Sequence, residues 1–451
     1  MNININYIIS TWNLTSIKNI DFDKTYIINV NSIPTLHLYL NKSNSKCTYC
    51  ETTNYYIRSS KTQRIKHVLS NGSYAEIIFH KRIYYCNNCC KVFSESLTNF
   101  ISSRGVSIYL EIAILEAMKN LSFTYKMIGE TFHVSDTFVC DIFDKRVSIT
   151  PLKLPYVLSV DEIYARRLTP TKYCCVLFDP LDDKIIDILY SRRKDLLEPY
   201  FSRKSKEEKS SVKYFICDLN DTYRCLAYKY FKGVTVIADS FHVIKNLSDD
   251  FKKIRIRIMK KHEEMRNDTM EYWLLKKFYW MLEMNIDDVK RDYYEFRKWN
   301  MTLSKHQLLD YLLKVDESLT EAYYLKESYR DFNRYHRINS DDDKLEIDQK
   351  LQDFIKAFHS SSSPEFKKFG NTLSNWRIEI INSFTYINNW RLSNAKIENI
   401  NGRIKDLMSI SYGFTNFERT RNRIIYTINK NQPFSTTKKY KSKRNKRKIK
   451  K

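Results

Sequence analysis

Three short apolar runs in the middle of the chain each end in an aspartate. They precede Asp161, Asp218 and Asp239 and cover residues 156–160, 214–217 and 234–238. A continuous apolar run of about four to eight residues, bounded by polar positions, is typical of a buried strand. Each aspartate is therefore predicted to lie where a buried strand ends.

The patterns between these runs predict an α/β core. Two more strand-like runs, 172–180 and 184–193, follow the first, and helical patterns occupy 194–211 and 221–231. The resulting order is β-β-β-α-β-α-β. Three strands in hairpin contact followed by two crossover units define a ribonuclease-H-like fold, and we expect the first part of this core in residues 151–245.

Beyond residue 245 the strand signals become sparse and the apolar residues follow a helical period. Leu247, Phe251, Ile254 and Ile258 form one such stripe. We therefore expect an all-helical insertion at residues 246–385 that interrupts the α/β core.

The segment 386–430 is expected to complete the core with its final helices. Ile397, Ile400, Ile404 and Leu407 recur at spacings of three, four and three residues, which predicts a helix with one buried stripe. Glu398 lies about 100° around the helix from Ile397 and falls outside this stripe.

The first 100 residues contain two Cys-x-x-Cys pairs separated by a strand-like alternation. The pairs are Cys47 with Cys50 and Cys86 with Cys89. Four thiolates complete the tetrahedral shell of Zn²⁺ and leave no open position, so such a site is structural. We predict a zinc ribbon at about residues 45–95, with Cys90 as an alternative ligand to Cys89.

Residues 101–150 are expected to be helical and to bind DNA. Three short helices, with a tight turn between the last two, are typical of a helix-turn-helix whose final helix enters the major groove, although similar helical hairpins occur without DNA. Ser135 suits the N-cap of the final helix. The candidate base-reading residues are Asp136, Thr137 and Cys140, and the candidate phosphate contacts are Lys145 and Arg146.

Composition and charge point to a globular protein with a polyanionic partner. Hydrophobic residues make up 43% of the 451 residues, which excludes wholesale disorder. Lys and Arg number 76 against 52 Asp and Glu, a net charge of +24. We expect a basic, disordered tail at 431–451, and subtracting its +10 still leaves +14 on the rest of the chain. Nucleic acid is the expected partner.

The strand-end aspartates add a candidate chemistry to this picture. A single aspartate at a strand end is commonly a turn residue, but carboxylates at the ends of neighbouring parallel strands converge. Such like charges repel unless a cation neutralises them, and Mg²⁺ prefers oxygen ligands. Two ions about 3.5–4 Å apart clamp both oxygens of an in-line phosphoryl transfer. The aspartates are therefore predicted magnesium ligands.

Three stretches resemble the DDE transposases of bacterial insertion sequences. They are Asp161-Glu162, the sequence DSFHVIK at 239–245, and NAKIENINGRIKDLMSISYGF at 394–414. The ISL-three type of this group also begins with a zinc ribbon and a helix-turn-helix, and the likeness runs from about residue 45 to residue 430. The resemblance implies a metal-dependent enzyme, acting as a homodimer, that binds terminal inverted repeats, cuts double-stranded DNA there and joins it to a target.

The resemblance carries the acidic triad to Asp161, Asp218 and Glu398, which would bind two Mg²⁺ ions, with Mn²⁺ as a substitute. Asp218 is chosen because the second aspartate of this fold ends the fourth strand, beside the first. Asp239 is the alternative, since it ends the fifth strand within the motif DSFH. Supporting roles are expected for Glu162, His242, Asn394 and Lys405.

Other functions and the cellular location are also predicted. A catalytically inactive or domesticated relative would only bind DNA, and a zinc-ribbon RNA-processing nuclease on the same fold is a further alternative. The chain has no continuous apolar run of about 18 residues and no signal-peptide pattern at its start. We expect a cytoplasmic, nucleoid-associated bacterial protein with no membrane partner, whose cysteines are thiols or metal ligands.

Overall fold

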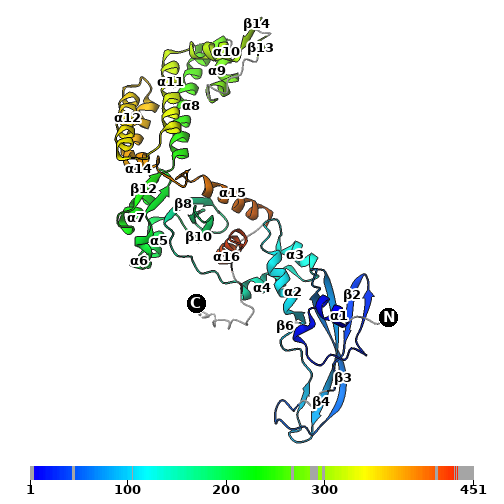
Figure 1. Cartoon of the computed structure of the whole chain (residues 1–451). Coiled ribbons are helices and arrows are strands. Elements are labelled where there is room, and N and C mark those ends of the chain that lie inside the picture. Colours follow the sequence, from blue (N-terminus) through cyan, green and yellow to red (C-terminus); the bar gives the residue numbers. More distant parts are fainter. Residues whose placement is uncertain are drawn as a thin grey trace, which may run out of the picture. The chain divides into compact units, whose positions relative to one another are not determined.

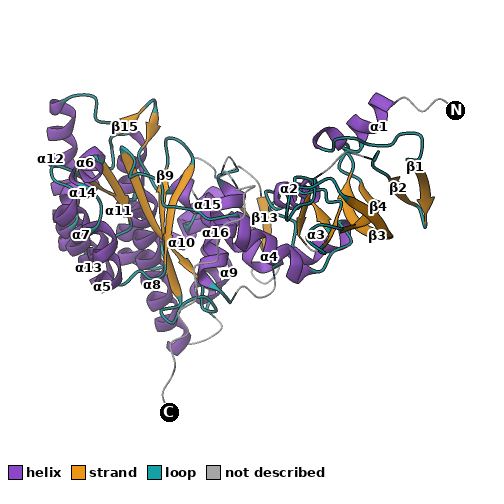
Figure 2. Cartoon of the chain, turned by 90° about the horizontal axis from the view of Figure 1, so that it is seen from below, coloured by secondary structure: helices purple, strands orange, loops and turns teal. Residues whose placement is uncertain are grey.

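The computed structural model describes residues 5–42, 46–103, 105–265, 269–284, 293–296, 300–411, 415–430, 432 and 434. The chain forms two compact units: unit 1 comprises Met1–Thr150 and Arg403–Lys451, and unit 2 comprises Pro151–Gly402. Figure 1 traces the chain, and Figure 2 separates helices from strands. The predicted tail lies outside the described residues apart from 432 and 434. No helix in the described ranges is long and apolar enough to cross a membrane.

Unit 1 is built on a seven-stranded sheet in the order β1-β2-β4-β3-β7-β6, with β5 paired to β4. Its strands are β1 (Tyr26–Val30), β2 (Ile33–Leu38), β3 (Tyr55–Val68), β4 (Tyr74–Cys86), β5 (Val92–Ser94), β6 (Ile101–Ser103) and β7 (Val106–Ser107). Leu36, Ile65, Ile77 and Phe79 point to one face of the sheet and are buried together with residues of α1 (Ile5–Thr11) and η1 (Leu14–Ser16). Period-two alternation thus gives this sheet one apolar face.

Three short helices follow the sheet, and each begins at a hydroxyl cap. They are α2 (Ile108–Ala117), α3 (Tyr125–Thr131) and α4 (Asp136–Arg146), capped by Ser107, Thr124 and Ser135. The turn between α3 and α4 is tight, because a Cβ at Gly129 would lie 2.7 Å from the carbonyl oxygen of Val134. Glycine is therefore the residue that this approach of two helices permits.

The last helix, α16 (Phe417–Ile428), packs within unit 1. Its Tyr426 hydroxyl donates to the Leu115 carbonyl at 3.2 Å, and its buried Arg423 donates to the Phe123 carbonyl at 2.9 Å. The predicted core segment 386–430 is thus divided, because α16 contacts the helices of unit 1. Its apolar period predicts a buried face but carries no information about which partner covers that face.

Unit 2 contains a five-stranded sheet in the order β10-β9-β8-β11-β12. Its strands are β8 (Val157–Tyr164), β9 (Tyr173–Asp179), β10 (Lys184–Leu189), β11 (Tyr214–Cys217) and β12 (Thr235–Ala238). The first three are antiparallel, and β11 is parallel to both β8 and β12. Helices α5 (Lys194–Ser202), α6 (Lys206–Ser211) and α7 (Asp221–Tyr230) fill the connections. All five predicted strands and the predicted order of elements are present.

One boundary differs from the prediction. Strand β8 continues past Asp161 to Tyr164, because Ile163 and Tyr164 still pair with β9. On its other side β8 pairs with β11 only as far as Ser159. Asp161 therefore still pairs with β9, but it lies beyond the last residue of β8 that pairs with β11.

The insertion of unit 2 is mainly helical. It contains α8 (Ser240–Met265), α9 (Met270–Lys277), η2 (Tyr279–Leu282), α10 (Lys305–Leu313), α11 (Glu317–Tyr335), α12 (Asp341–Ser360), α13 (Pro364–Asn375) and α14 (Arg377–Asn382). The predicted stripe of Leu247, Phe251, Ile254 and Ile258 on α8 is buried in its core. A small hairpin of β13 (Tyr293–Phe296) and β14 (Met301–Ser304) interrupts the helices. After a second hairpin, β15 (Tyr386–Ile387) and β16 (Trp390–Arg391), α15 (Ala395–Ile410) begins.

Candidate functional site

The parallel register of unit 2 puts three aspartates in one row. Ser159 pairs with Ile216, and Ile216 pairs with Ile237. Asp161, Asp218 and Asp239 each lie two residues beyond this row, so they share one face on three adjacent strands. Strands are about 4.8 Å apart, and β11 is the middle one. Asp218 is thus the central carboxylate of what we call the aspartate row.

The two outer aspartates are held by hydrogen bonds. Asp161 accepts from the Glu162 backbone N–H at 2.7 Å and from Asn401 Nδ2 at 2.6 Å. Asp239 accepts from the Asn394 backbone N–H at 2.9 Å and contacts His242 Nδ1 at 2.8 Å. Asp239 is fully buried, and each of its oxygens has a partner.

Asn394 ties the row to the start of α15. Its Oδ1 accepts from the Ser159 hydroxyl at 2.5 Å, and its Nδ2 donates to the Val160 carbonyl at 3.2 Å and to Asp218 at 3.3 Å. The Asn394 carbonyl accepts from the Glu398 N–H at 2.9 Å, which is the first backbone bond of α15. This fully buried amide therefore fixes the first turn of α15, which carries Glu398, against the strand ends.

His242 Nδ1 lies among three carboxylates. It is 3.1 Å from Asp218, 2.8 Å from Asp239 and 4.0 Å from Glu398. His242 is in the first turn of α8, which begins directly after Asp239. Asp218, Asp239 and His242 offer ligand atoms within 4.8 Å of one another. Two of the predicted triad residues, Asp218 and Glu398, thus lie with Asp239 around one imidazole nitrogen, and Asp161 is not among its contacts.

The electrostatics of this cluster show a concentration of negative charge. Burial and the charge of Asp161 raise the pKa of Asp218 to about 7. Burial also raises the pKa of Asp161, and burial with the charge of Asp239 raises that of Glu398. Burial opposes protonation of His242, but its hydrogen bond to Asp239 and the charge of Asp218 raise its pKa. Each shift favours the form that reduces the net negative charge.

Glu162 lies away from the aspartate row, on the opposite face of the sheet. Adjacent residues of a strand face opposite sides, and Glu162 accepts from Tyr223 at 3.1 Å and pairs with Arg192 at 2.6 Å. Tyr223 belongs to α7, on the face opposite to Asp161. Lys405 is exposed, seven residues after Glu398 on α15, and belongs to the part of the chain grouped in unit 1.

Asn401 was not among the site residues predicted from the sequence. It lies three residues after Glu398, on the same side of α15, and bonds directly to Asp161. Its position beside a predicted metal ligand was visible in the helical period. Its burial, with only 4% of its surface exposed, was not.

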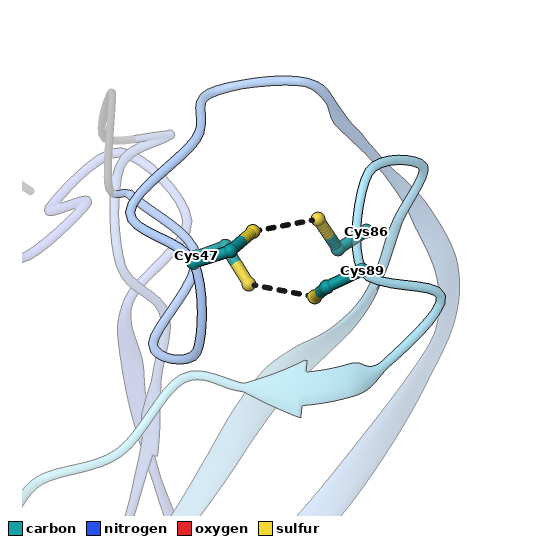
Figure 3. Close-up of side chains that lie close together, drawn as sticks. Cys47, Cys86 and Cys89 are labelled. Carbon is teal, nitrogen blue, oxygen red and sulfur yellow. Dashed lines mark hydrogen bonds between the residues drawn. The ribbon is translucent and has the colours of Figure 1, made fainter.

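The four predicted zinc ligands form a second cluster in unit 1. Cys47, Cys50, Cys86 and Cys89 have sulfurs within 4.8 Å of one another. Figure 3 shows the side chains of Cys47, Cys86 and Cys89 pointing toward one another from the two Cys-x-x-Cys turns. Two of the separations are 3.7 Å, between Cys47 and Cys89, and 3.5 Å, between Cys50 and Cys86. Tetrahedral Zn–S bonds of about 2.3 Å require sulfurs about 3.8 Å apart. The donor set fits a structural zinc ion.

Cys90 stands outside this cluster for a geometric reason. The backbone N–H of Cys90 donates to the Cys86 carbonyl, and the N–H of Glu51 donates to the Cys47 carbonyl, both at 3.0 Å. Cys90 and Glu51 also share a positive φ, 55° and 57°. The two knuckles therefore have the same turn, with Cys90 at the position after the last ligand. Its thiol is exposed, 4.0 Å from the Asn87 carbonyl oxygen.

The predicted DNA contacts on α4 differ in exposure. Asp136 and Thr137 are exposed at its first turn, and Cys140 and Lys145 are half-buried. Arg146 is only 3% exposed, and its Nε donates to Glu111 at 2.9 Å. The guanidinium of Arg146 thus faces an internal carboxylate on α2.

Two families match this chain. Residues 158–424 match the ISL3-type DDE family described as a transposase, and residues 43–89 match the family described as the zinc-finger of transposase IS204/IS1001/IS1096/IS1165. The first match covers more than half of the chain and includes the aspartate row and Glu398. The second includes all four cluster cysteines. No curated protein matches the chain at a significant level.

Proposed function

Because this chain belongs to the ISL3 family of DDE transposases, we propose that it binds the terminal inverted repeats of an insertion sequence and catalyses metal-dependent cleavage and strand transfer of DNA there. Its partners are then double-stranded DNA of the element's ends and of the target. Pairing two ends calls for a homodimer. Its five-stranded sheet serves as a ribonuclease-H-like core, which the strand order β10-β9-β8-β11-β12 supports.

The observation that carries this proposal is the meeting of carboxylates from two neighbouring strands and a distant helix. Asp161 and Asp218 are separated by 57 residues and Glu398 lies 180 residues further on, yet His242 Nδ1 lies 3.1 Å from Asp218 and 4.0 Å from Glu398. Asn401, on the helix of Glu398, donates to Asp161 at 2.6 Å, and the charge of Asp161 contributes to the raised pKa of Asp218. Such a cluster of carboxylates with raised pKa values is typical of sites that bind divalent cations.

We assign the triad to Asp161, Asp218 and Glu398, with Asp239 in a supporting role. The Asp239 side chain is fully buried and both of its oxygens are engaged, whereas 26% of the Asp218 side chain is exposed. A ligand to a metal that also contacts DNA needs an accessible oxygen. Asp239 instead orients His242 and anchors the backbone of Asn394.

The oxygen-rich donor set fits Mg²⁺, with Mn²⁺ as a substitute. When bound, two such ions supply charge neutralisation and orientation for an in-line attack on a phosphodiester. The chain's own residues hold that geometry: Asn394 fixes the start of α15 and Asn401 fixes Asp161. His242 lies within reach of Asp218 and Glu398, where it balances their charge when no cation is bound. The chemistry needs no covalent intermediate, because positioning and electrostatics suffice.

Unit 1 is the proposed DNA-recognition part. The zinc ribbon and a helix-turn-helix formed by α3 and α4 would read the end sequence. The proposed base-reading residues, Asp136, Thr137 and Cys140, lie in the N-terminal half of α4. Lys145 suits a phosphate. Arg146 serves this helix by anchoring it to α2 through Glu111.

The proposal is tested with duplex DNA that carries the sequence flanking this reading frame in its source genome. Purified full-length protein should nick the 3′ ends of that duplex and join them to a target plasmid in the presence of Mg²⁺, and should do neither without it. A scrambled duplex is the control. Binding to the flanking duplex without any nick would favour the inactive, DNA-binding alternative. Preferential cleavage of RNA would favour the nuclease alternative.

The choice of Asp218 over Asp239 has its own test. Asp218→Asn should abolish nicking while leaving the binding of the end duplex unchanged, since it removes a charge and keeps the shape. Asp239→Asn should retain a measurable rate, because an amide oxygen can still accept the Asn394 N–H. Full activity in Asp218→Asn together with complete loss in Asp239→Asn would transfer the ligand role to Asp239.

A further inference from the structure

The side-chain amide of Asn401 is hydrogen-bonded through its nitrogen, whereas its oxygen has no partner among the described residues. Its Nδ2 donates to Asp161 at 2.6 Å, whereas its Oδ1 is buried and has no hydrogen-bond partner in the described part of the chain. Reversing the amide would bring two oxygens to this short distance, so the carboxylate of Asp161 determines which way it points.

An unpartnered, buried amide oxygen is rare and calls for an explanation. The nearby Asn394 makes the contrast clear, because its side-chain oxygen accepts from Ser159 and its nitrogen has two acceptors. Both polar atoms of the Asn394 side chain thus have hydrogen-bond partners within the protein. Asn401, with only 4% of its surface exposed, is hydrogen-bonded through its nitrogen alone, and that nitrogen faces a proposed metal ligand.

The position of Asn401 links the two most distant members of the triad. It lies one turn after Glu398 on α15 and bonds to Asp161 on β8. Asp161 uses its other oxygen to accept the Glu162 N–H. Asn401 is therefore the side chain that sets the carboxylate of Asp161 relative to the helix that carries Glu398.

We propose that Asn401 is a positioning residue of the acidic site: its Nδ2 fixes the Asp161 carboxylate, and its Oδ1 accepts a hydrogen bond from a water molecule that accompanies the divalent cation. This inference rests on the proposed function. Mg²⁺ loses its water reluctantly and usually keeps several water molecules when bound by one or two carboxylates. Each such water is a donor that needs an acceptor, and partners of this kind orient the ligands around a metal.

The test measures cation binding directly, with Mn²⁺ as the probe and full-length, zinc-loaded protein in buffer without Mg²⁺. Free Mn²⁺ is followed by its electron paramagnetic resonance signal. Asn401→Ala should weaken Mn²⁺ binding by about 10- to 100-fold, the usual effect of removing a partner of a metal ligand. Its thermal midpoint without added Mn²⁺ should change little, because the alanine also removes the orphaned oxygen. Saturating Mn²⁺ should restore most of the nicking rate.

Asn382→Ala is the matched control. Asn382 is also a buried amide of unit 2, but its Nδ2 donates at 2.9 Å to the backbone carbonyl of Val236. This variant should lower the thermal midpoint and leave the Mn²⁺ affinity unchanged. The same pattern in Asn401→Ala, a lower midpoint with unchanged affinity, would overturn the inference and leave Asn401 with a purely structural role.

Two more variants separate this inference from the proposed function. Asp161→Asn and Glu398→Gln should lose Mn²⁺ binding if the acidic cluster is the metal site at all. Normal binding in both would refute the proposed site. Loss in both with normal binding in Asn401→Ala would refute only the role of Asn401. If the alanine variant does not fold, Asn401→Ser provides the same comparison, since its shorter side chain cannot reach both partners and should also weaken Mn²⁺ binding.

Discussion

The cysteine cluster of unit 1 and the aspartate row of unit 2 are both suited to bind cations, but they are assembled differently. The cysteines lie on two short turns of the same design, and each Cys-x-x-Cys pair brings its own two sulfurs together. The aspartates come from three strands, and only the parallel register of β8, β11 and β12 aligns them. Local chain geometry makes the first cluster, and long-range topology makes the second.

The two clusters also differ in how they tolerate the absence of a cation. The aspartate row has internal means of reducing its charge, since the pKa of Asp218 is raised to about 7 and His242 lies beside it. The strands that carry it also bury a large apolar cluster on their opposite face. The cysteine cluster is accompanied by only a small apolar cluster that includes Tyr84 and Phe93. Folding of the ribbon should thus depend on its metal, whereas the acidic site should need its metal only for activity.

The largest expected effect comes from breaking the cysteine cluster with Cys86→Ser. Structural zinc sites contribute about 10–16 kcal/mol of binding free energy, as much as the whole stability of a typical domain. Zinc content should fall from one ion per chain to near zero. Hydrogen exchange should show loss of protection in the strand ends near the knuckles, while unit 2 keeps its protection.

Cys90→Ser is the matched control for that experiment, since it removes a thiol four residues away that lies outside the cluster. This variant should keep its zinc and its protection. Zinc loss in Cys90→Ser, with normal zinc in Cys89→Ser, would mean that Cys90 is the ligand.

Breaking the aspartate row with Asp218→Ala should have the opposite profile. Nicking and strand transfer should fall by about 10³-fold or more, because the charge neutralisation that divalent ions supply is worth several kcal/mol. The thermal midpoint without added Mg²⁺ should not fall, since the change removes the central charge of a mutually repelling set. The exposed Asp249 on α8 provides a control, and Asp249→Ala should leave both measurements unchanged. A large loss of stability in Asp218→Ala would show that the row, like the cysteines, is part of the folding core.

The sequence predicts the local cluster completely and the long-range one in part. Cys-x-x-Cys spacing is a property of a single turn, so the four zinc ligands could be read from the sequence. The apolar runs predicted all five strands and placed Asp161, Asp218 and Asp239 near their ends. Which of these oxygens are engaged depends on Asn394 and His242, which approach from elsewhere in the chain. That information is tertiary and leaves no trace in local periodicity.

Two other features were out of reach for similar reasons. A lysine or arginine in the last turn of a predicted DNA-reading helix suggests a phosphate contact, but Arg146 is paired with an internal glutamate 35 residues earlier. The burial of Asn401 likewise depends on the strand that it faces. In both cases the residue type could be read from the sequence, whereas the partner that the residue contacts in the fold could not.

The buried ion pair of Glu111 and Arg146 provides a third case to compare with the two clusters. Its two charges neutralise each other, so it needs no metal ion. Removing one member of a buried ion pair leaves an uncompensated charge and costs about 3–5 kcal/mol. Glu111→Gln should therefore destabilise unit 1 by about that amount in chemical denaturation, with or without metal. The exposed pair of Glu116 and Lys119 on the same region of the chain is the control, and Glu116→Gln should cost less than about 1 kcal/mol.

The same pair distinguishes two roles for Arg146. If it anchors α4, Arg146→Met should weaken the binding of the end duplex through loss of stability, and the salt dependence of binding should keep its slope. A direct phosphate contact would instead reduce the slope of log K against log salt by about 1. A reduced slope with unchanged stability would contradict the anchoring role.

The smallest expected effect concerns a group that needs no counter-charge. His67 of β3 is fully enclosed, with Nδ1 at 2.8 Å from the Ser107 hydroxyl and Nε2 at 3.0 Å from the Trp12 carbonyl. Burial lowers its pKa to about 4, whereas carboxylates raise the pKa of His242 in unit 2. In the unfolded chain a histidine has a pKa of about 6.5. As the pH falls from 7 towards 4, the unfolded chain therefore takes up the proton first.

The stability that comes from keeping His67 neutral is accordingly complete above about pH 6.5 and is lost progressively as the pH falls towards 4, by about 3 kcal/mol at most. His67→Gln should lower the stability of unit 1 at pH 7 but flatten its decline between pH 7 and pH 5, as measured by urea titration with hydrogen exchange at the β3 amides. Zinc is present in both proteins, so its own acid sensitivity cancels in the difference. The exposed His133 provides the control, and His133→Gln should decline as the wild type does. An unchanged slope in His67→Gln would mean that the imidazole titrates alike in the folded and the unfolded chain, and a steeper decline would mean that it is protonated in the native state. Unit 1 would then hold a charge as unit 2 does, with a partner to balance it.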